Sequence, residues 1–336
     1  MPLLDTETTW AALRSTRSEP PGRAEKGKRR STYIAALEQA EQLLRAASTV
    51  GVAARPLLLF YGLSQGGRAV AAAASTLGNS DFQLSGHGIK SDTSTWIGPL
   101  ASVTVYSDNS TTGSFNRLSA LLQSPIWDKR APVSVGEIWN SLPEAEHWAL
   151  PAGARTSPPL TAALETITAG ENAPIPIFLS VGGVPKEFMP NSGQGSSGDL
   201  EAFFSRYPAL AGYAAIRSVG VYPGESGGRA ELVYPTDKSG YLDRHKEVEP
   251  RLTTYRFRKD LVFPAIGSNG QALHPLMAWW SLLYALSMLA RYQPEVWAQH
   301  IAIDSSKAAV AIERLLAESL AAVPELILQT ILEVSS

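Results

Sequence analysis

Residues 62–67 (Gly-Leu-Ser-Gln-Gly-Gly) most constrain the fold of this 336-residue chain, because they allow two incompatible structures. The segment lies between an apolar run at residues 56–61 and an alanine-rich run at residues 69–74. As a G-x-S-x-G nucleophile elbow, it would turn sharply from a strand into a helix and expose Ser64. As the middle of one long helix over residues 56–77, it would be buried against its neighbours.

The surrounding sequence favours the helix. A nucleophile elbow follows a central strand of a parallel sheet, yet the residues before Ser64 predict a polar arm and one helix. No His-Gly-Gly-Gly-like oxyanion segment precedes it. Pro56 suits the first turn of a helix, and Gly78-Asn79 would end it. Gly66 and Gly67 would each cost about 1 kcal/mol relative to alanine, so close packing must offset them.

A serine hydrolase is the alternative function. A hydrolase needs a nucleophile, a base that takes its proton and an acid that orients the base. Ser64 would be the catalytic nucleophile, with His245 or His274 as the base, and Asp243 and Asp304 are conceivable acids.

Composition and charge exclude several classes of protein. The chain is 44% hydrophobic and 18% charged, which is ordinary for a soluble globular protein. Its net charge of −2 argues against non-specific nucleic-acid binding, which needs a basic domain. The absence of cysteine excludes disulfides and thiolate metal sites.

The distribution of apolar residues along the chain also predicts where in the cell the protein is found. The polar start of the chain lacks a signal-peptide pattern. The longest apolar run, at residues 276–290, is shorter than the roughly 20 residues that a bilayer crossing needs. We therefore expect a cytoplasmic protein that does not associate with a membrane.

Periodicity predicts helices at both ends of the chain and strands between them. The long helices are expected at residues 31–48, 56–77, 275–292, 307–321 and 324–334. Strands are expected at residues 102–107, 175–181, 229–234 and 253–262, and short helices at residues 115–122, 135–141 and 200–209. Two Gly/Ser-rich segments, residues 191–198 and 224–228, are expected to be surface loops.

This order of elements predicts an α+β fold, with N- and C-terminal helices packed as one framework and a mixed β-strand middle region. The expected parts are a basic polar arm (residues 1–30), an N-terminal helical part (31–92), the middle region (93–270) and a C-terminal helical part (271–336). We interpret the basic stretch at residues 14–30 as a solvated arm or loop, with a phosphate-binding arm as the alternative.

Several segments resemble the YaaC-like bacterial proteins. Residues 56–69 (Pro-Leu-Leu-Leu-Phe-Tyr-Gly-Leu-Ser-Gln-Gly-Gly-Arg-Ala), followed by Ser-Gly-His-Gly-Ile-Lys at residues 85–90, resemble the start of that family. His274-Pro-Leu and the block at residues 282–297 resemble its most recognisable segment, and residues 133–143 also fit. The resemblance spans both ends of the chain and supports the helical interpretation of residues 56–77. The family has no established activity that could be transferred.

The N-terminal helices also have a distant likeness to HEPN domains, many of which are ribonucleases with an Arg-x(4–6)-His pair. No histidine of this chain has an arginine five to seven residues before it, and Arg291 and His300 are nine apart. An RNA-directed or defence protein that lacks this pair is therefore a second alternative, with nucleic acid an unlikely partner.

The best candidate ligand-binding residues are polar groups that could converge beside the helix at residues 56–77. Ser64 and Arg68 are four residues apart and so share one helix face. The following loop could fold back along that face and bring His87 and Lys90 with it, and Arg291 could join from the C-terminal helix. Such a cationic pocket would suit a phosphate or a carboxylate.

The expected partner is therefore a small anionic ligand or another protein. No spacing typical of metal ligands occurs, and no cofactor is expected. The Trp279-Trp280 pair predicts either core packing or a self-association face, so a homo-oligomer is a further expectation.

Overall fold

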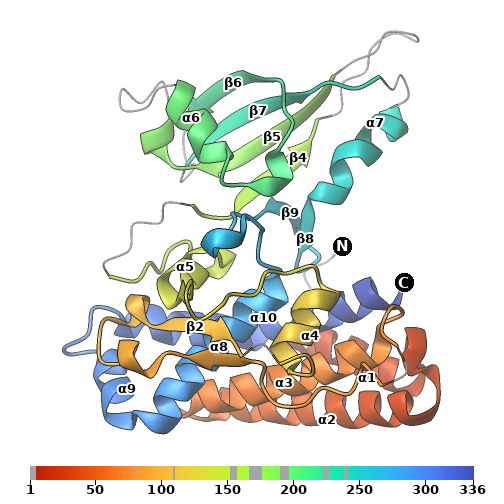
Figure 1. The fold of residues 1–336 in the computed structure, drawn as a ribbon, viewed down its shortest axis with the longest axis vertical. Coiled ribbons are helices and arrows are strands. Elements are labelled where there is room, and N and C mark those ends of the chain that lie inside the picture. Colours follow the sequence, from red (N-terminus) through yellow and green to blue (C-terminus); the bar gives the residue numbers. More distant parts are fainter. Residues whose placement is uncertain are drawn as a thin grey trace. The chain divides into compact units, whose positions relative to one another are not determined.

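The fold is α+β, as the sequence predicts (Figure 1). The computed structural model describes residues 5–78, 80–108, 110–151, 157–165, 176–189, 197–221, 227–237 and 241–336. The chain forms two compact units. The first comprises Met1–Ala154, Ile266–Asn269 and Leu273–Ser336, and the second comprises Arg155–Ala265 and Gly270–Ala272. The first unit thus includes residues 93–154, which the sequence assigned to the middle region.

Helices from both ends of the chain build the first unit. Those from the N-terminal end are α1 (Thr6–Ser18), α2 (Gly27–Thr49) and α3 (Arg55–Ala73). Those from the C-terminal end are α8 (Pro275–Tyr292), α9 (Pro294–Ile301) and α10 (Ala309–Ser335). Helix α3 packs against α2, α8 and α10, and α1 packs against α10 (Figure 1). The predicted framework of terminal helices is therefore confirmed.

The burial of these helices follows their sequence patterns. Helix α2 turns one apolar face inward, at spacings of three and four residues. That face contains Tyr33, Leu37, Ala40, Leu44 and Ala47. Helix α8 is buried on every side from Pro275 to Leu289, as expected of an almost wholly apolar helix at the centre of a core.

Helix α10 is one continuous helix, so the prediction of two helices at residues 307–321 and 324–334 is wrong. Pro324 lies inside it and removes one backbone hydrogen bond, but the apolar residues on both sides of Pro324 are buried and hold the helix together. Of the described helices, α10 alone is long and apolar enough to cross a membrane by length and composition. Its most apolar window is 67% buried inside the protein, which is typical of a core helix.

The basic stretch at residues 14–30 is mostly helical, so its interpretation as a solvated arm or loop is wrong. It forms the end of α1, the 3₁₀ turn η1 (Gly22–Glu25) and the start of α2. Arg17 of α1 forms an ion pair with Glu38 of α2 at 2.7 Å. The apolar pattern of α1 is too short to be recognised in the sequence, because Trp10 and Leu13 are its only buried apolar residues.

A small antiparallel sheet and two short helices complete most of the first unit. The sheet contains β1 (Ile89–Ser91), β2 (Thr104–Ser107) and β3 (Val133–Ser134) in that order, and β1 and β2 pack against α8. Strand β2 and helices α4 (Ser114–Leu121) and α5 (Val135–Asn140) confirm the predictions for these segments. Helix α9 is a helix that the sequence analysis does not predict, and it begins at Pro294, because proline fits the first turn of a helix.

The second unit is a six-stranded antiparallel sheet in the order β6-β7-β5-β4-β9-β8. Its strands are β4 (Leu160–Leu164), β5 (Ile177–Val184), β6 (Ala215–Val221), β7 (Gly228–Tyr234), β8 (Thr253–Tyr255) and β9 (Lys259–Val262). Helix α6 (Ser197–Phe204) lies against the sheet and shares a buried core with it, through Phe203 and Phe204 (Figure 1). Helix α7 (Tyr241–Val248) follows β7 in the chain.

Two predictions for this unit need correction. The strand expected at residues 253–262 is a hairpin, in which Arg256 and Phe257 have φ angles of 51° and 55° between β8 and β9. Positive φ at both central residues is the geometry of a tight hairpin turn, which usually contains glycine or asparagine. Strands β4 and β6 were not predicted. Most of the two expected Gly/Ser-rich loops, residues 191–196 and 224–226, lies outside the described residues.

Candidate functional site

Ser64 lies in the middle of α3 and not on a turn. Helix α3 is continuous from Arg55 to Ala73, and Ser64 is only 8% exposed. Among the described residues, the first strand begins at Ile89, after this helix. A nucleophile elbow needs a strand before the serine, so the elbow interpretation of residues 62–67 is wrong and the helical one is confirmed.

His274, the candidate base of a hydrolase that lies in the same unit as Ser64, does not pair with it. His274 caps α8: its Nδ1 accepts a hydrogen bond from the backbone amide of Leu276 at 3.2 Å, and its Nε2 lies 3.3 Å from Glu333 Oε2. His245 lies in α7 of the second unit. Among the described residues of the first unit, Ser64 forms no hydrogen bond with His274. A proton transfer from Ser64 to His274 therefore has no support in this geometry.

One face of α3 is polar and carries two of the predicted site residues. Tyr61, Ser64 and Arg68 follow each other at spacings of three and four residues, which places them on the same side of the helix. Nη1 of Arg68 donates a hydrogen bond to the carbonyl oxygen of Leu84 at 2.8 Å. The loop after α3 thus does fold back along this face, as the sequence predicts.

His87 lies at the end of that loop, enclosed by aromatic rings. Its ring centroid is 5.2 Å from that of Phe60, 5.8 Å from that of Tyr284 and 6.5 Å from that of Tyr61. The loop is fixed from the other side, because the backbone amide of Phe115 in α4 donates to the carbonyl oxygen of His87 at 2.9 Å.

The next residue, Gly88, explains why the loop can turn here. It has a φ angle of +74°, and a Cβ atom at this position would lie 2.8 Å from the carbonyl carbon of Gly113. Glycine is the residue that tolerates both the left-handed backbone and this close approach of two chain segments. The Gly-His-Gly sequence is thus a structural requirement for placing His87.

Arg291 reaches the same place from the last turn of α8. Its Nη1 donates a hydrogen bond to the hydroxyl oxygen of Tyr61 at 3.1 Å, and its guanidinium lies over the ring of Tyr292, 5.0 Å from the centroid. A cation in the last turn also interacts favourably with the partial negative charge of the helix C-terminus.

We call this group the α3–α8 cluster. It consists of Tyr61, Ser64, Arg68, His87, Tyr284 and Arg291. The pKa of His87 lies below its ordinary value of 6.5, mainly because of burial, and also because of the positive charges of Arg291 and Arg68, which Asp108 opposes. Burial, and then the charge of Asp108, raise the pKa of the Tyr284 hydroxyl. The cluster is therefore a half-buried cationic surface with a neutral imidazole at neutral pH.

Lys90, the remaining predicted site residue, forms no hydrogen bond or ion pair with the cluster among the described residues. It lies on β1, directly opposite Tyr106 of β2, and its side chain is exposed. Tyr106 in turn is close enough to Tyr284 to influence its pKa. Lys90 thus lies on the same hairpin as groups near the cluster.

The sequence did not reveal the aromatic members of the cluster. Tyr61 could have been found from its spacing to Ser64 and Arg68, but Tyr284 could not, because α8 is apolar on every face.

Among the described residues, no three His, Asp or Glu side chains form a group that could hold a metal ion.

The fold and the cluster define an α+β protein in which a helical framework carries a cationic surface enclosed by aromatic rings. The YaaC-like protein family matches residues 6–331, so the chain belongs to this family. No curated protein and no solved structure matches the chain.

Proposed function

We propose that this YaaC-like protein binds a small anionic ligand at the α3–α8 cluster. The observation that carries the proposal is that Arg68 and Arg291 flank His87 without a carboxylate partner. Among the described residues, neither arginine forms an ion pair. Asp108 is near enough to oppose their effect on His87, but among the described residues it forms no ion pair with either arginine, so a bound anion would relieve the remaining repulsion between the two cations.

The chemistry of the surrounding groups suits a carboxylate or a phosphate. Guanidinium groups present planar pairs of N–H donors that match the oxygens of both anions. The neutral imidazole of His87 adds one N–H donor, and the hydroxyl of Tyr61 can donate another. The rings of Phe60 and Tyr284 exclude water from one side, which strengthens electrostatic contacts with a ligand.

The other expectations stay predictions of the sequence. A protein partner, a HEPN-like role with RNA and a homo-oligomer have no observation in their favour comparable to the unpaired arginines. We also retain the cytoplasmic location as a proposal, supported by the composition of the chain.

Thermal unfolding in the presence of citrate, inorganic phosphate, a nucleoside monophosphate or a short acyl carboxylate tests the proposal. At least one of these anions is expected to raise the Tm of the protein. Arg291→Gln should weaken the binding of that anion at least about tenfold, because a charge-assisted hydrogen bond contributes about 1.5–3 kcal/mol.

Arg314→Gln provides the matched control. Arg314 of α10 is also an exposed helix arginine over an aromatic ring, 5.5 Å from the centroid of Trp148, but it lies outside the cluster. Its replacement should leave anion binding unchanged. If no anion raises the Tm, or if both variants weaken binding equally, the proposal is wrong.

A further inference from the structure

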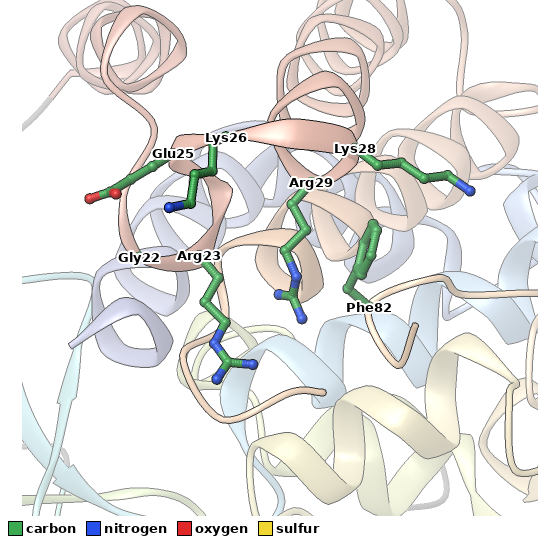
Figure 2. Close-up of a pocket in the computed structure, with 7 residues that line it drawn as sticks. All are labelled: Gly22, Arg23, Glu25, Lys26, Lys28, Arg29 and Phe82. Atoms are coloured by element: carbon green, nitrogen blue, oxygen red, sulfur yellow. The ribbon is translucent and has the colours of Figure 1, made fainter. Parts of the chain in front are cut away.

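A second cationic site lies where η1 leads into α2. A cavity of about 460 Å³ opens there, lined by four basic side chains, one acidic side chain and one ring, in addition to Gly22. These are Arg23, Lys26, Lys28, Arg29, Glu25 and Phe82 (Figure 2). We call this cavity the basic pocket. Its cations come from the basic stretch at residues 14–30, which the α3–α8 cluster does not use.

Arg29 forms the buried wall of the basic pocket. It is 9% exposed, and its Nη2 donates hydrogen bonds to the carbonyl oxygens of Leu77 and Gly78 at 2.7 and 2.6 Å. Its guanidinium also lies 4.6 Å from the centroid of the Phe82 ring. Arg29 therefore holds the chain after α3 in place, and its positive charge remains beneath the pocket.

The other cations have free donors. Arg23 uses Nη1 to bind the carbonyl oxygen of Leu77 at 2.6 Å, which fixes its guanidinium beside that of Arg29 (Figure 2). Lys26 and Lys28 are exposed, and among the described residues neither forms an ion pair. Glu25 points away from Arg29 and Lys28 (Figure 2). The positive charge of the pocket is thus only partly compensated.

The backbone at the pocket is also arranged for an anion. Gly27 has a φ angle of +65°, and the residues after it are helical. A left-handed residue followed by right-handed ones directs successive amide groups toward one point and forms an anion-binding concavity. Among the described residues, no side chain caps this end of α2, so its first-turn amides have no side-chain acceptor there. Helix α2 is 23 residues long, and its N-terminus carries the positive end of the helix dipole.

We propose that the basic pocket binds the phosphate groups of a small phosphorylated ligand. The first-turn amides of α2 would hold one phosphate group, with Lys26 and Arg23 on one side of the pocket and Lys28 on the other (Figure 2). Several donors around one point match a phosphate group, which has more acceptor oxygens and more charge than a carboxylate. The cavity has the size of a small-molecule site. A nucleic-acid-binding protein usually has a broad basic surface, and the net charge of −2 argues against such a surface in this protein.

Titration calorimetry with inorganic tripolyphosphate and inorganic phosphate at low ionic strength tests this proposal. The wild-type protein should bind tripolyphosphate more tightly than phosphate. The double variant Lys26→Gln/Lys28→Gln should lose at least about tenfold in affinity for tripolyphosphate, since it removes two charged donors. Both lysines are exposed, so the Tm of the variant should stay close to that of the wild type.

Two controls separate the basic pocket from other causes. The double variant Lys129→Gln/Arg130→Gln removes the same charge from another exposed position of the first unit, and it should keep wild-type affinity. Arg314→Gln should also keep it, because Arg314 of α10 lies outside both the basic pocket and the α3–α8 cluster. The proposal is wrong if the wild-type protein does not bind tripolyphosphate, or if the two double variants weaken binding equally. It is also wrong if a single-stranded oligonucleotide binds more tightly than tripolyphosphate and depends on the same two lysines.

Discussion

Gly67 of α3 and Trp280 of α8 lie in direct contact: a Cβ atom on Gly67 would lie 2.5 Å from Cζ3 of Trp280. The absence of a side chain at this position lets the two helices approach closely. Trp280 is fully buried, and its ring meets that of Phe60 edge-on, with centroids 6.0 Å apart. The same close approach brings Tyr61 of α3 within hydrogen-bond distance of Arg291 of α8. A glycine in the core thus helps to assemble the α3–α8 cluster.

Replacing Gly67 by alanine should destabilise the protein. Alanine would improve helix propensity by about 1 kcal/mol, but the added methyl group would overlap a buried indole ring that has no space to move. Overpacking of this kind costs about 1–3 kcal/mol and more where several neighbours must shift. We expect a net loss of about 1–2 kcal/mol, measured as a lower Tm.

Gly51→Ala is the control for this prediction. A Cβ atom on Gly51 would meet nothing within 4 Å, so alanine there should change stability by less than about 0.5 kcal/mol or increase it slightly. Equal effects of the two substitutions would contradict the packing argument.

The terminal helices could be predicted because their apolar residues follow the helical period. The buried face of α2 and the wholly apolar α8 are visible in the sequence itself. Pro324 led to the wrong prediction of two helices in place of α10. A proline inside a helix costs free energy locally, but the packing of the residues around it can offset that cost. Strands β4 and β6 were missed because alanine, serine and glycine interrupt the alternation of large apolar residues in their sequences.

The candidate site was predictable only in its local part. Ser64 and Arg68 share a helix face by their spacing, and the glycines beside His87 indicated a loop that could turn back. Tyr284 was invisible, because an all-apolar helix gives no sign of which residue faces a polar neighbour. The basic pocket depends on the φ angle of Gly27 and on the carbonyl oxygens that Arg29 reaches, and neither can be read from composition.

Replacing Arg29 by methionine should destabilise the first unit. The guanidinium donates to five carbonyl oxygens, those of Ala71, Ala72, Ala74, Leu77 and Gly78. Methionine has a similar volume but no donor, so buried carbonyl groups would lose their partners at about 1–3 kcal/mol each where water cannot replace them. We expect a loss of at least about 2 kcal/mol, measured by chemical denaturation.

Lys28→Met tests whether this effect is specific to Arg29. Lys28 is one residue earlier in α2 and exposed, so its replacement should change stability by less than about 0.5 kcal/mol. The role assigned to Arg29 would be wrong if both variants were equally stable.

Ser64→Ala should leave the protein folded and equally stable. Ser64 lies inside a helix, where alanine has the higher propensity, and the substitution removes only one hydroxyl group. A fluorophosphonate probe should not label Ser64 in the wild-type protein, because Ser64 lies inside a continuous helix and forms no hydrogen bond with a histidine among the described residues of the first unit. Mass spectrometry of the peptide around residue 64 measures this directly, with Ser64→Ala as the reference. Specific labelling that the variant abolishes would restore the hydrolase hypothesis.

His87 should make the protein less stable as the pH falls below 6.5. Its pKa in the folded protein lies below that value, so between the two pKa values the unfolded chain binds a proton that the folded protein does not. Stability from this source is therefore complete above pH 6.5 and is lost as the pH falls toward the folded pKa. Burial of His300 lowers its pKa too and acts in the same direction, so His87→Gln should remove only part of the pH dependence.

The contribution of neighbouring charges to the lowered pKa of His87 can be measured separately from the contribution of burial. The charges that face its ring are Arg68 from α3, Arg291 from α8 and, opposing them, Asp108 after β2. Arg291→Gln should therefore raise the pKa of His87 toward 6.5 without a change in its burial, as measured by NMR titration of the imidazole Cε1–H signal. An anion bound in the cluster should raise it in the same way, so anion affinity should increase as the pH falls. A His87 pKa that does not respond to Arg291→Gln would show that the arginine is too distant to share a ligand with the imidazole.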